Sequence, residues 1–282
     1  MQRSTGGCSR RCRRAWTTAM RDALAYTVQG SPGRPPVVWL HGFLGTAADW
    51  QPILVRLGEA VRAIAVDAPG HGGSVGLPDE AYTMAGASRR LIDVLDREGV
   101  DRAALVGYSM GGRWALYVAL HHPDRVRALV LESASPGLAS PADRAARRRL
   151  DADRARQIQA DLPAFLENWY RMPLFASLHR HPERLRQMIA ARRQNDPAEL
   201  ARSLAGMGTG AQPSLWERLG GLRVHTLALA GRLDAAYVER ARQMAARSAR
   251  VQVAVVPEAG HIVHAEQPEA FTDQLRSFLS LA

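Results

Sequence analysis

The sequence predicts an α/β protein whose mostly parallel sheet is covered by helices on both faces and interrupted by an inserted helical segment. Short apolar runs rich in β-branched residues alternate with helical patterns, which is typical of strands buried on both faces. The alternation stops between about Ser140 and Leu219, where only charged helical patterns occur, and then resumes. The expected strands are Val37 to Leu40, Ala63 to Val66, Ala104 to Val106, Ala128 to Leu131, Thr226 to Leu229 and Val251 to Val256. Functional groups in such sheets lie at the carboxyl ends of the strands.

The length of 282 residues suits one domain with an insertion. We expect residues 1–15 to be a disordered basic extension, 16–139 and 220–282 to form the core, and 140–219 to form a helical cap. The aromatic side chains of the cap are Trp169, Tyr170, Phe175 and Trp216. Because a purely solvated insertion needs fewer of them, they either pack onto the core or line a pocket.

The formal net charge of +10 does not indicate a nucleic-acid partner. Five arginines stand in the first fifteen residues, and the remaining charges are interleaved with acids without an aromatic and basic stripe. No apolar run approaches the ~18 residues of a membrane span. Cys8 and Cys12, the only cysteines, both fall in the extension, which lacks the apolar core of a secretory signal. We therefore expect a cytoplasmic monomer or small homo-oligomer that binds neither nucleic acid nor membrane.

The strand that ends at Val106 runs into Gly107-Tyr108-Ser109-Met110-Gly111 and then into a helical pattern. Five such residues arise easily by chance, but a strand before them and a helix after them form the context of a nucleophile elbow. The sequence therefore predicts the α/β-hydrolase fold, with Ser109 as catalytic nucleophile or base.

A serine hydroxyl needs a base, and a neutral imidazole oriented by a carboxylate usually supplies it. Asp234 follows the expected strand after the cap, and His261 follows the last strand, which gives the Ser, Asp, His order of this fold. His264 is the nearest rival, but its position falls on the next helix. Asp67 is expected to support a turn.

Two backbone amides are candidates for an oxyanion hole. Phe43 lies in the loop after the first strong strand, and Met110 follows Ser109. His41 either orients that loop or takes a direct part. Arg113 lies one helical turn after Ser109, where its guanidinium suits a substrate carboxylate, unless it is a surface arginine.

From about Val37 to the C-terminus the chain resembles the 2-succinyl-6-hydroxy-2,4-cyclohexadiene-1-carboxylate synthases of menaquinone biosynthesis, which have the α/β-hydrolase fold. The core motifs that carry the resemblance are Leu40-His41-Gly42-Phe43-Leu44-Gly45 with Trp50, Asp67 through Ser74, and Val106 through Arg113. Those motifs fit many relatives of the fold. Caps vary more freely, so the more specific matches are Ser135-Pro136-Gly137-Leu138, Trp169-Tyr170 with Pro173, Phe175-Ala176-Ser177-Leu178, and Met207 through Trp216.

The resemblance implies a lyase that expels pyruvate by proton abstraction, with no metal and no cofactor. Ser109, made basic by His261 and Asp234, would remove the proton, while the Phe43 and Met110 amides would stabilise the oxyanion. The substrate carries several carboxylates. Matching positions for substrate binding are His41, Tyr108, Arg113, Arg147, Trp169, Arg192 and Gln212. Arg147 is one of three consecutive arginines, and Arg192 stands beside Arg193. The match of each to the family's arginine therefore stays open by one residue.

Two other classes of function fit parts of the pattern. A serine hydrolase acting on a small ester or C–C bond substrate would share the elbow and the triad. The cap arginines favour the lyase, because an enzyme for neutral substrates has no use for buried cations. A ligand-binding receptor with this fold is the third class, and an intact triad argues against it.

Overall fold

The computed structural model describes residues 22–281, and the extension expected at residues 1–15, with both cysteines, lies outside them. The strands form one sheet in the order β1-β3-β2-β4-β5-β6-β7, with every pair parallel except β1 and β3. Their bounds are β1 Tyr26–Gln29, β2 Pro36–Leu40, β3 Arg62–Val66, β4 Ala103–Tyr108, β5 Val126–Glu132, β6 Thr226–Gly231 and β7 Val251–Val256. The six expected strands and the α/β class are confirmed. The antiparallel edge strand β1 was not expected.

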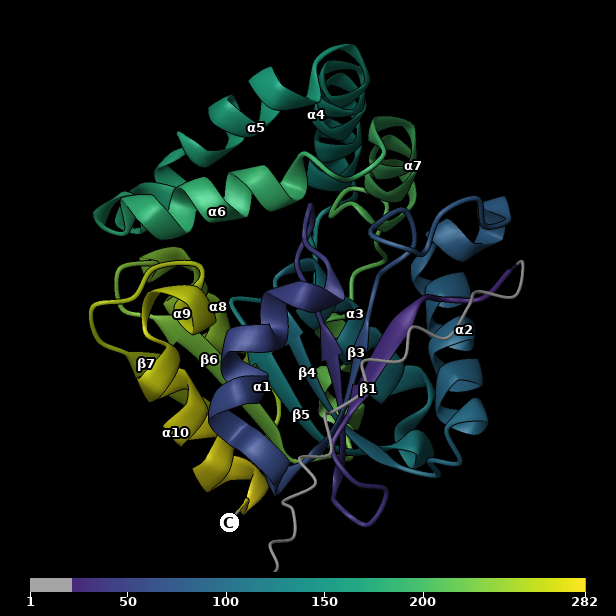
Figure 1. Cartoon of the computed structure of the whole chain (residues 1–282), viewed down its shortest axis with the longest axis vertical. Helices are drawn as coiled ribbons and strands as arrows, with labels where there is room; N and C mark the ends of the chain where they lie inside the picture. Colours follow the sequence, from purple (N-terminus) through teal and green to yellow (C-terminus); the bar gives the residue numbers. More distant parts are fainter. Residues whose placement is uncertain (1–21, 282) are drawn as a thin grey trace, which may run out of the picture.

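Helices cover both faces of the sheet (Figure 1). On one face lie α1 (Gln51–Leu57), α9 (Val263–Glu266) and α10 (Pro268–Leu279), and on the other α2 (Met84–Arg97), α3 (Met110–His121) and α8 (Ala235–Ala245). Successive residues of a strand point to opposite faces. In β2, Val37 and Trp39 accordingly join the core under α1 and α10, whereas Val38 and Leu40 join the core under α2 and α3. Both faces of the strands are therefore apolar.

The segment between β5 and β6 holds four α-helices. They are α4 (Pro141–Ala160), α5 (Leu162–Tyr170), α6 (Pro182–Arg192) and α7 (Pro197–Met207), joined by the 3₁₀ segments η5 (Pro173–Arg180) and η6 (Trp216–Gly221). Figure 1 shows α4 to α7 gathered at one end of the sheet. Ser140, Asp161 and Asp196 accept backbone N–H groups at the starts of α4, α5 and α7, and a proline follows in each first turn. The exact bounds of the cap stay a prediction.

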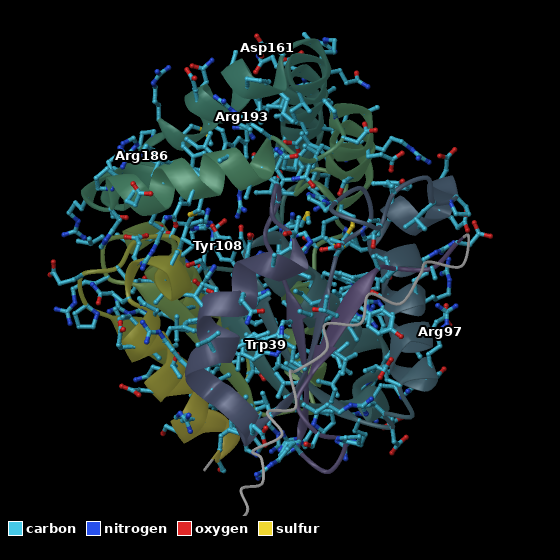
Figure 2. All side chains as sticks on the ribbon, in the orientation of Figure 1. Trp39, Arg97, Tyr108, Asp161, Arg186 and Arg193 are labelled. Carbon is cyan, nitrogen blue, oxygen red and sulfur yellow. The ribbon has the colours of Figure 1, made fainter. Side chains whose placement is uncertain are left out.

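Shorter 3₁₀ segments complete the core: η1 Ala47–Trp50, η2 Gly58–Ala60, η3 Asp79–Tyr82 and η4 Pro123–Arg125. Within residues 22–281, no helix has the length and apolar character needed to cross a membrane. Figure 2 places Tyr108 where the cap meets the sheet, with Arg193 on the cap itself. The carboxyl end of β4 therefore lies next to the cap.

Candidate active site

Ser109 occupies a sharp turn between β4 and α3, with φ 50° and ψ −106°. A Cβ on Gly107 would lie 2.4 Å from the carbonyl oxygen of Gly111, and one on Gly111 would lie 2.2 Å from the carbonyl oxygen of Leu40. Both positions therefore exclude a side chain. The Ser109 amide donates a 2.8 Å hydrogen bond to the carbonyl of Glu132, which ties the strained residue to β5. The structure has the geometry of a nucleophile elbow.

His261 joins Asp234 to Ser109. Its Nδ1 lies 2.7 Å from Oδ2 of Asp234, and its Nε2 lies 3.3 Å from Oγ of Ser109. Because an ionised carboxylate only accepts, the neutral ring carries its proton on Nδ1 and leaves Nε2 free to take the serine proton. The rival His264 bonds instead to Glu132, at 2.8 Å. The three expected residues are therefore brought together in the expected order.

A buried carboxylate holds the loop that carries His261. Glu266 is 3% exposed and accepts the amide of Gly260 at 2.9 Å and that of Ile262 at 3.2 Å. Both amides flank the histidine, so Glu266 fixes the backbone from which the imidazole projects. Sequence analysis did not identify this residue.

The amides of Phe43 and Met110 have no acceptor anywhere in the described part of the chain. Both residues border the cavity that Ser109 faces, as an oxyanion hole requires. His41 does not. Its Nε2 accepts the amide of Ala68 at 2.9 Å, so its Nδ1 donates to the carbonyl of Gly42 at 2.7 Å. Burial lowers the pKa of His41. Both ring nitrogens therefore fix the loop, and the expectation that His41 binds substrate stays a prediction.

A cavity of about 310 Å³ opens beside the triad, between the cap and the sheet. Its wall is formed by Phe43, Ser109, Met110, Arg113, Arg147, Arg154, Trp169, Met172, Pro173, Leu174, Leu204, Gly208, Thr209, Tyr237 and His261. A smaller hollow shares Ser109, Trp169 and His261 with it and extends to Tyr108. The wall combines apolar surface with three guanidinium groups.

Arg113 is only 8% exposed, and two protein oxygens accept hydrogen bonds from its guanidinium. Nη1 donates to the carbonyl of Met207 at 2.9 Å and to Oε1 of Gln212 at 2.6 Å. Its Nη2 and Nε have no protein acceptor among residues 22–281. Burial lowers the pKa of Arg113 to about 10, so the group is charged at neutral pH. Gln212 is fully buried and absent from the cavity wall, so it supports Arg113, and its contact with substrate stays a prediction.

Of the three consecutive cap arginines, Arg147 is the one that lines the cavity. It lines the cavity and donates Nε–H to Oδ1 of Asp151 at 2.7 Å, one turn along α4. Arg148 bonds to the carbonyl of Gly210, and Arg149 is exposed. Arg147 is thus the member of the run that faces the triad.

Arg192 on the cap pairs with a carboxylate of the core. Its Nη1 and Nη2 bond to the two carboxylate oxygens of Asp49 at 2.7 and 2.5 Å, and its Nε donates to the hydroxyl of Tyr170 at 3.1 Å. Burial opposes the charge, but Asp49 and Tyr170 outweigh it and raise the pKa of Arg192. Although Arg192 borders the smaller hollow, all three of its nitrogens are engaged. It ties the cap to the core, and its contact with substrate stays a prediction.

Tyr108 and Trp169 both border the smaller hollow beside the triad. The Tyr108 ring packs edge-on against His261, with centroids 5.5 Å apart, and Trp169 packs against Phe43 at 5.7 Å. Sequence analysis missed Tyr237, whose ring centroid lies 4.7 Å from that of His261. Its place three residues after Asp234, in the first turn of a helix, was the available signal.

Sequence analysis also missed Arg154. It stands seven residues after Arg147 on α4, a spacing of two turns that puts both side chains on one face. Among the described residues, no cluster of three or more His, Cys, Asp or Glu side chains is placed to hold a metal ion.

The chain is similar to known proteins over most of its length. The profile of a family described as alpha/beta hydrolase fold matches residues 35–268. A Serratia proteamaculans protein named 2-succinyl-6-hydroxy-2,4-cyclohexadiene-1-carboxylate synthase is 36% identical over 256 residues, which cover 89% of this chain and 95% of that protein. A Bacillus subtilis protein provisionally given the same name is 37% identical over 264 residues, 92% of this chain and 96% of its own. The solved structure of MenH from S. aureus has a TM-score of 0.86 at 32% identity and covers 90% of this chain and 97% of that one.

Proposed function

We propose that the chain is a lyase of menaquinone biosynthesis. It belongs to the 2-succinyl-6-hydroxy-2,4-cyclohexadiene-1-carboxylate synthase family of the α/β-hydrolase fold. Its substrate would be 2-succinyl-5-enolpyruvyl-6-hydroxy-3-cyclohexene-1-carboxylate, from which it eliminates pyruvate. The observation that carries the proposal is the pair Arg113 and Arg147 in the cavity beside the triad. Leaving a guanidinium poorly paired in a buried wall costs free energy unless an anion completes it.

The triad would supply the base. His261 takes the Ser109 proton through Nε2, with the imidazolium stabilised by Asp234. The serine oxygen then removes the proton from ring carbon 2, which lies next to the ketone of the succinyl group. No bond between serine and substrate is required.

Electron flow in the ring completes the elimination. The pair released from the C2–H bond becomes the C2–C3 double bond, the C3–C4 double bond shifts to C4–C5, and the C5–O bond breaks. Pyruvate leaves as its enolate and is protonated on carbon, so no water is added. Negative charge that develops on the ketone oxygen during the step is matched by the amides of Phe43 and Met110, which have no other acceptor.

The arginines would orient the substrate for this step. A guanidinium binds a carboxylate through two parallel hydrogen bonds, and such pairs are stronger away from bulk water. Arg113 projects from the core helix α3 and Arg147 from the cap helix α4, so a substrate with several carboxylates would bridge them. We also propose a cytoplasmic location and a monomer or small homo-oligomer. Sedimentation of the purified chain tests the second point.

A coupled assay tests the proposed reaction. The unstable substrate is generated enzymatically, the protein is added, and diene absorbance is followed together with pyruvate release. Both signals should rise together in a 1:1 ratio. Turnover of simple aryl esters without acceleration of either signal would instead identify a serine hydrolase.

A further inference from the structure

A second cavity, of about 220 Å³, lies between the cap helix α6 and the core segments η1, α1 and α9 (Figure 1). Among the described residues, none that lines this second cavity also borders the active cavity beside the triad. Arg192 and Met188 line both the second cavity and the smaller hollow, so their side chains form the partition between the two. The second cavity therefore lies outside the space assigned to the reaction.

His264 supplies an unpartnered nitrogen to the inner end of the second cavity. The residue is 7% exposed, and its Nδ1 lies 2.8 Å from a carboxylate oxygen of the fully buried Glu132. Because an ionised carboxylate only accepts, Nδ1 carries a proton, and in the neutral ring Nε2 is an acceptor. Nε2 has no hydrogen-bond partner within residues 22–281. Trp50 and Tyr108 pack against the ring, with centroids 4.6 and 5.1 Å away, and hold it in this orientation.

The other polar groups at the inner end are already paired. The two carboxylate oxygens of Asp49 accept the Nη groups of Arg192, and Nε of Arg192 donates to the hydroxyl of Tyr170. The inner end thus presents a lone pair on Nε2 of His264 and, among the described side chains that line it, no free N–H group. A ligand completes this end only if it brings a donor such as an O–H group.

The outer end of the second cavity carries an unpaired positive charge. Arg184 projects from α6 and is half-buried, and its guanidinium has no acceptor in the part of the chain that the structure describes. Arg56 faces it from α1, where it is 40% exposed and already pairs with Glu269 at 2.5 Å. A ligand whose far end is anionic would therefore balance the charge of Arg184.

We propose that the second cavity is a separate ligand site for a small hydroxycarboxylic acid. Its hydroxyl group would donate to Nε2 of His264, its apolar body would fill the middle, and its carboxylate would lie at Arg184. The inference does not rest on the proposed function. Because the walls come from the cap helix α6 and from the core, an occupant would bind both and stabilise the contact that Arg192 and Asp49 make between them.

A series of three ligands tests the two polar ends separately. Calorimetric titration compares 4-hydroxybenzoate with 4-fluorobenzoate, which has nearly the same shape without the O–H donor, and with 4-hydroxybenzyl alcohol, which lacks the charge. We expect 4-hydroxybenzoate to bind with a Kd below about 1 mM. The fluoro compound should bind about tenfold more weakly or worse, because it leaves Nε2 unsatisfied, and the alcohol about three- to tenfold more weakly.

Variants locate the binding on the protein. Arg184→Gln should weaken 4-hydroxybenzoate about three- to tenfold and leave the affinity for the alcohol unchanged. Arg186→Gln is the matched control, because Arg186 lies on the same helix but is 73% exposed and pairs with Glu183. Ala265→Leu adds volume to the wall of the second cavity and should abolish binding, with urea unfolding as the check that this variant folds. Arg113→Met alters the active cavity alone and should keep the wild-type affinity.

Three outcomes would overturn the proposal. Absence of 4-hydroxybenzoate binding would refute the ligand class, and equal affinity for the hydroxy and fluoro compounds would refute the role of His264. Weaker binding in Arg113→Met with wild-type binding in Arg184→Gln would place the ligand in the active cavity. None of these measurements uses pyruvate release, so the second site and the proposed lyase stand or fall independently.

Discussion

Replacing Arg113 by methionine keeps most of the side-chain volume and removes the guanidinium closest in sequence to Ser109. A buried hydrogen-bonded charge pair is worth about 2 to 4 kcal/mol when one partner is truncated. Arg113 is 8% exposed and its Nη2 and Nε have no acceptor among residues 22–281, so its pair with a carboxylate falls in this range. Since about 1.4 kcal/mol is tenfold, kcat/KM for pyruvate release should fall about 30- to 1000-fold.

Stopped-flow measurement of kcat/KM, with the substrate generated in place, gives the required range. The same substitution leaves the carbonyl of Met207 and Oε1 of Gln212 without their donor, which should lower the free energy of unfolding by about 1 to 3 kcal/mol in urea. Arg113→Lys is the control for charge, and should recover part of the loss but not the bidentate geometry. A folded Arg113→Met protein with wild-type kcat/KM would refute the reasoning.

Three further substitutions test other parts of the structure. Gly111→Ala should cost about 1 to 3 kcal/mol in urea unfolding and reduce turnover, because its Cβ would meet a backbone carbonyl at 2.2 Å; a wild-type midpoint would contradict this. Asp49→Asn should cost about 3 to 5 kcal/mol, because it leaves the Arg192 charge buried and unpaired. Burial opposes ionisation of Asp49, but Arg192 outweighs it and lowers the pKa of this carboxyl, so the pair stabilises the fold at neutral pH and that contribution is lost as pH falls through the lowered pKa. Unfolding followed from neutral to acid pH should therefore show a flatter acid-side decline in Asp49→Asn, and parallel curves would argue against the pair. Glu266→Ala frees the two amides that flank His261 and should lower kcat ~10-fold or more with KM little changed, whereas Glu266→Gln keeps one acceptor and should recover part of it. Equal turnover in both variants and the wild type would make Glu266 dispensable for positioning.

Much of the fold follows from local pattern. The strands β2 to β7 are apolar runs between helical segments, and the elbow at Ser109 predicted the α/β-hydrolase fold. The edge strand β1 was not predicted, because its four residues Tyr26–Gln29 are mostly half-buried and lack a continuous apolar run. Pairing with β3, and not its own pattern, makes it a strand.

Candidate site residues were predictable where strand ends position them. Ser109, Asp234 and His261 each follow a parallel strand, so sheet geometry alone brings them to one edge. The pair between Arg192 and Asp49 was not predicted, because the two residues lie 143 positions apart and no local pattern reveals it. Arg154 could have been found, since its spacing from Arg147 places both on one face of α4.

The most direct test of the account is the rate of pyruvate release by Ser109→Ala. The hydroxyl lies 3.3 Å from Nε2 of His261, and without it the triad has no oxygen to act as base. We expect turnover to fall ~10³-fold or more, with diene formation lost in parallel and urea unfolding unchanged. Elimination at the wild-type rate by the folded variant would contradict the central claim that Ser109 performs the proton abstraction.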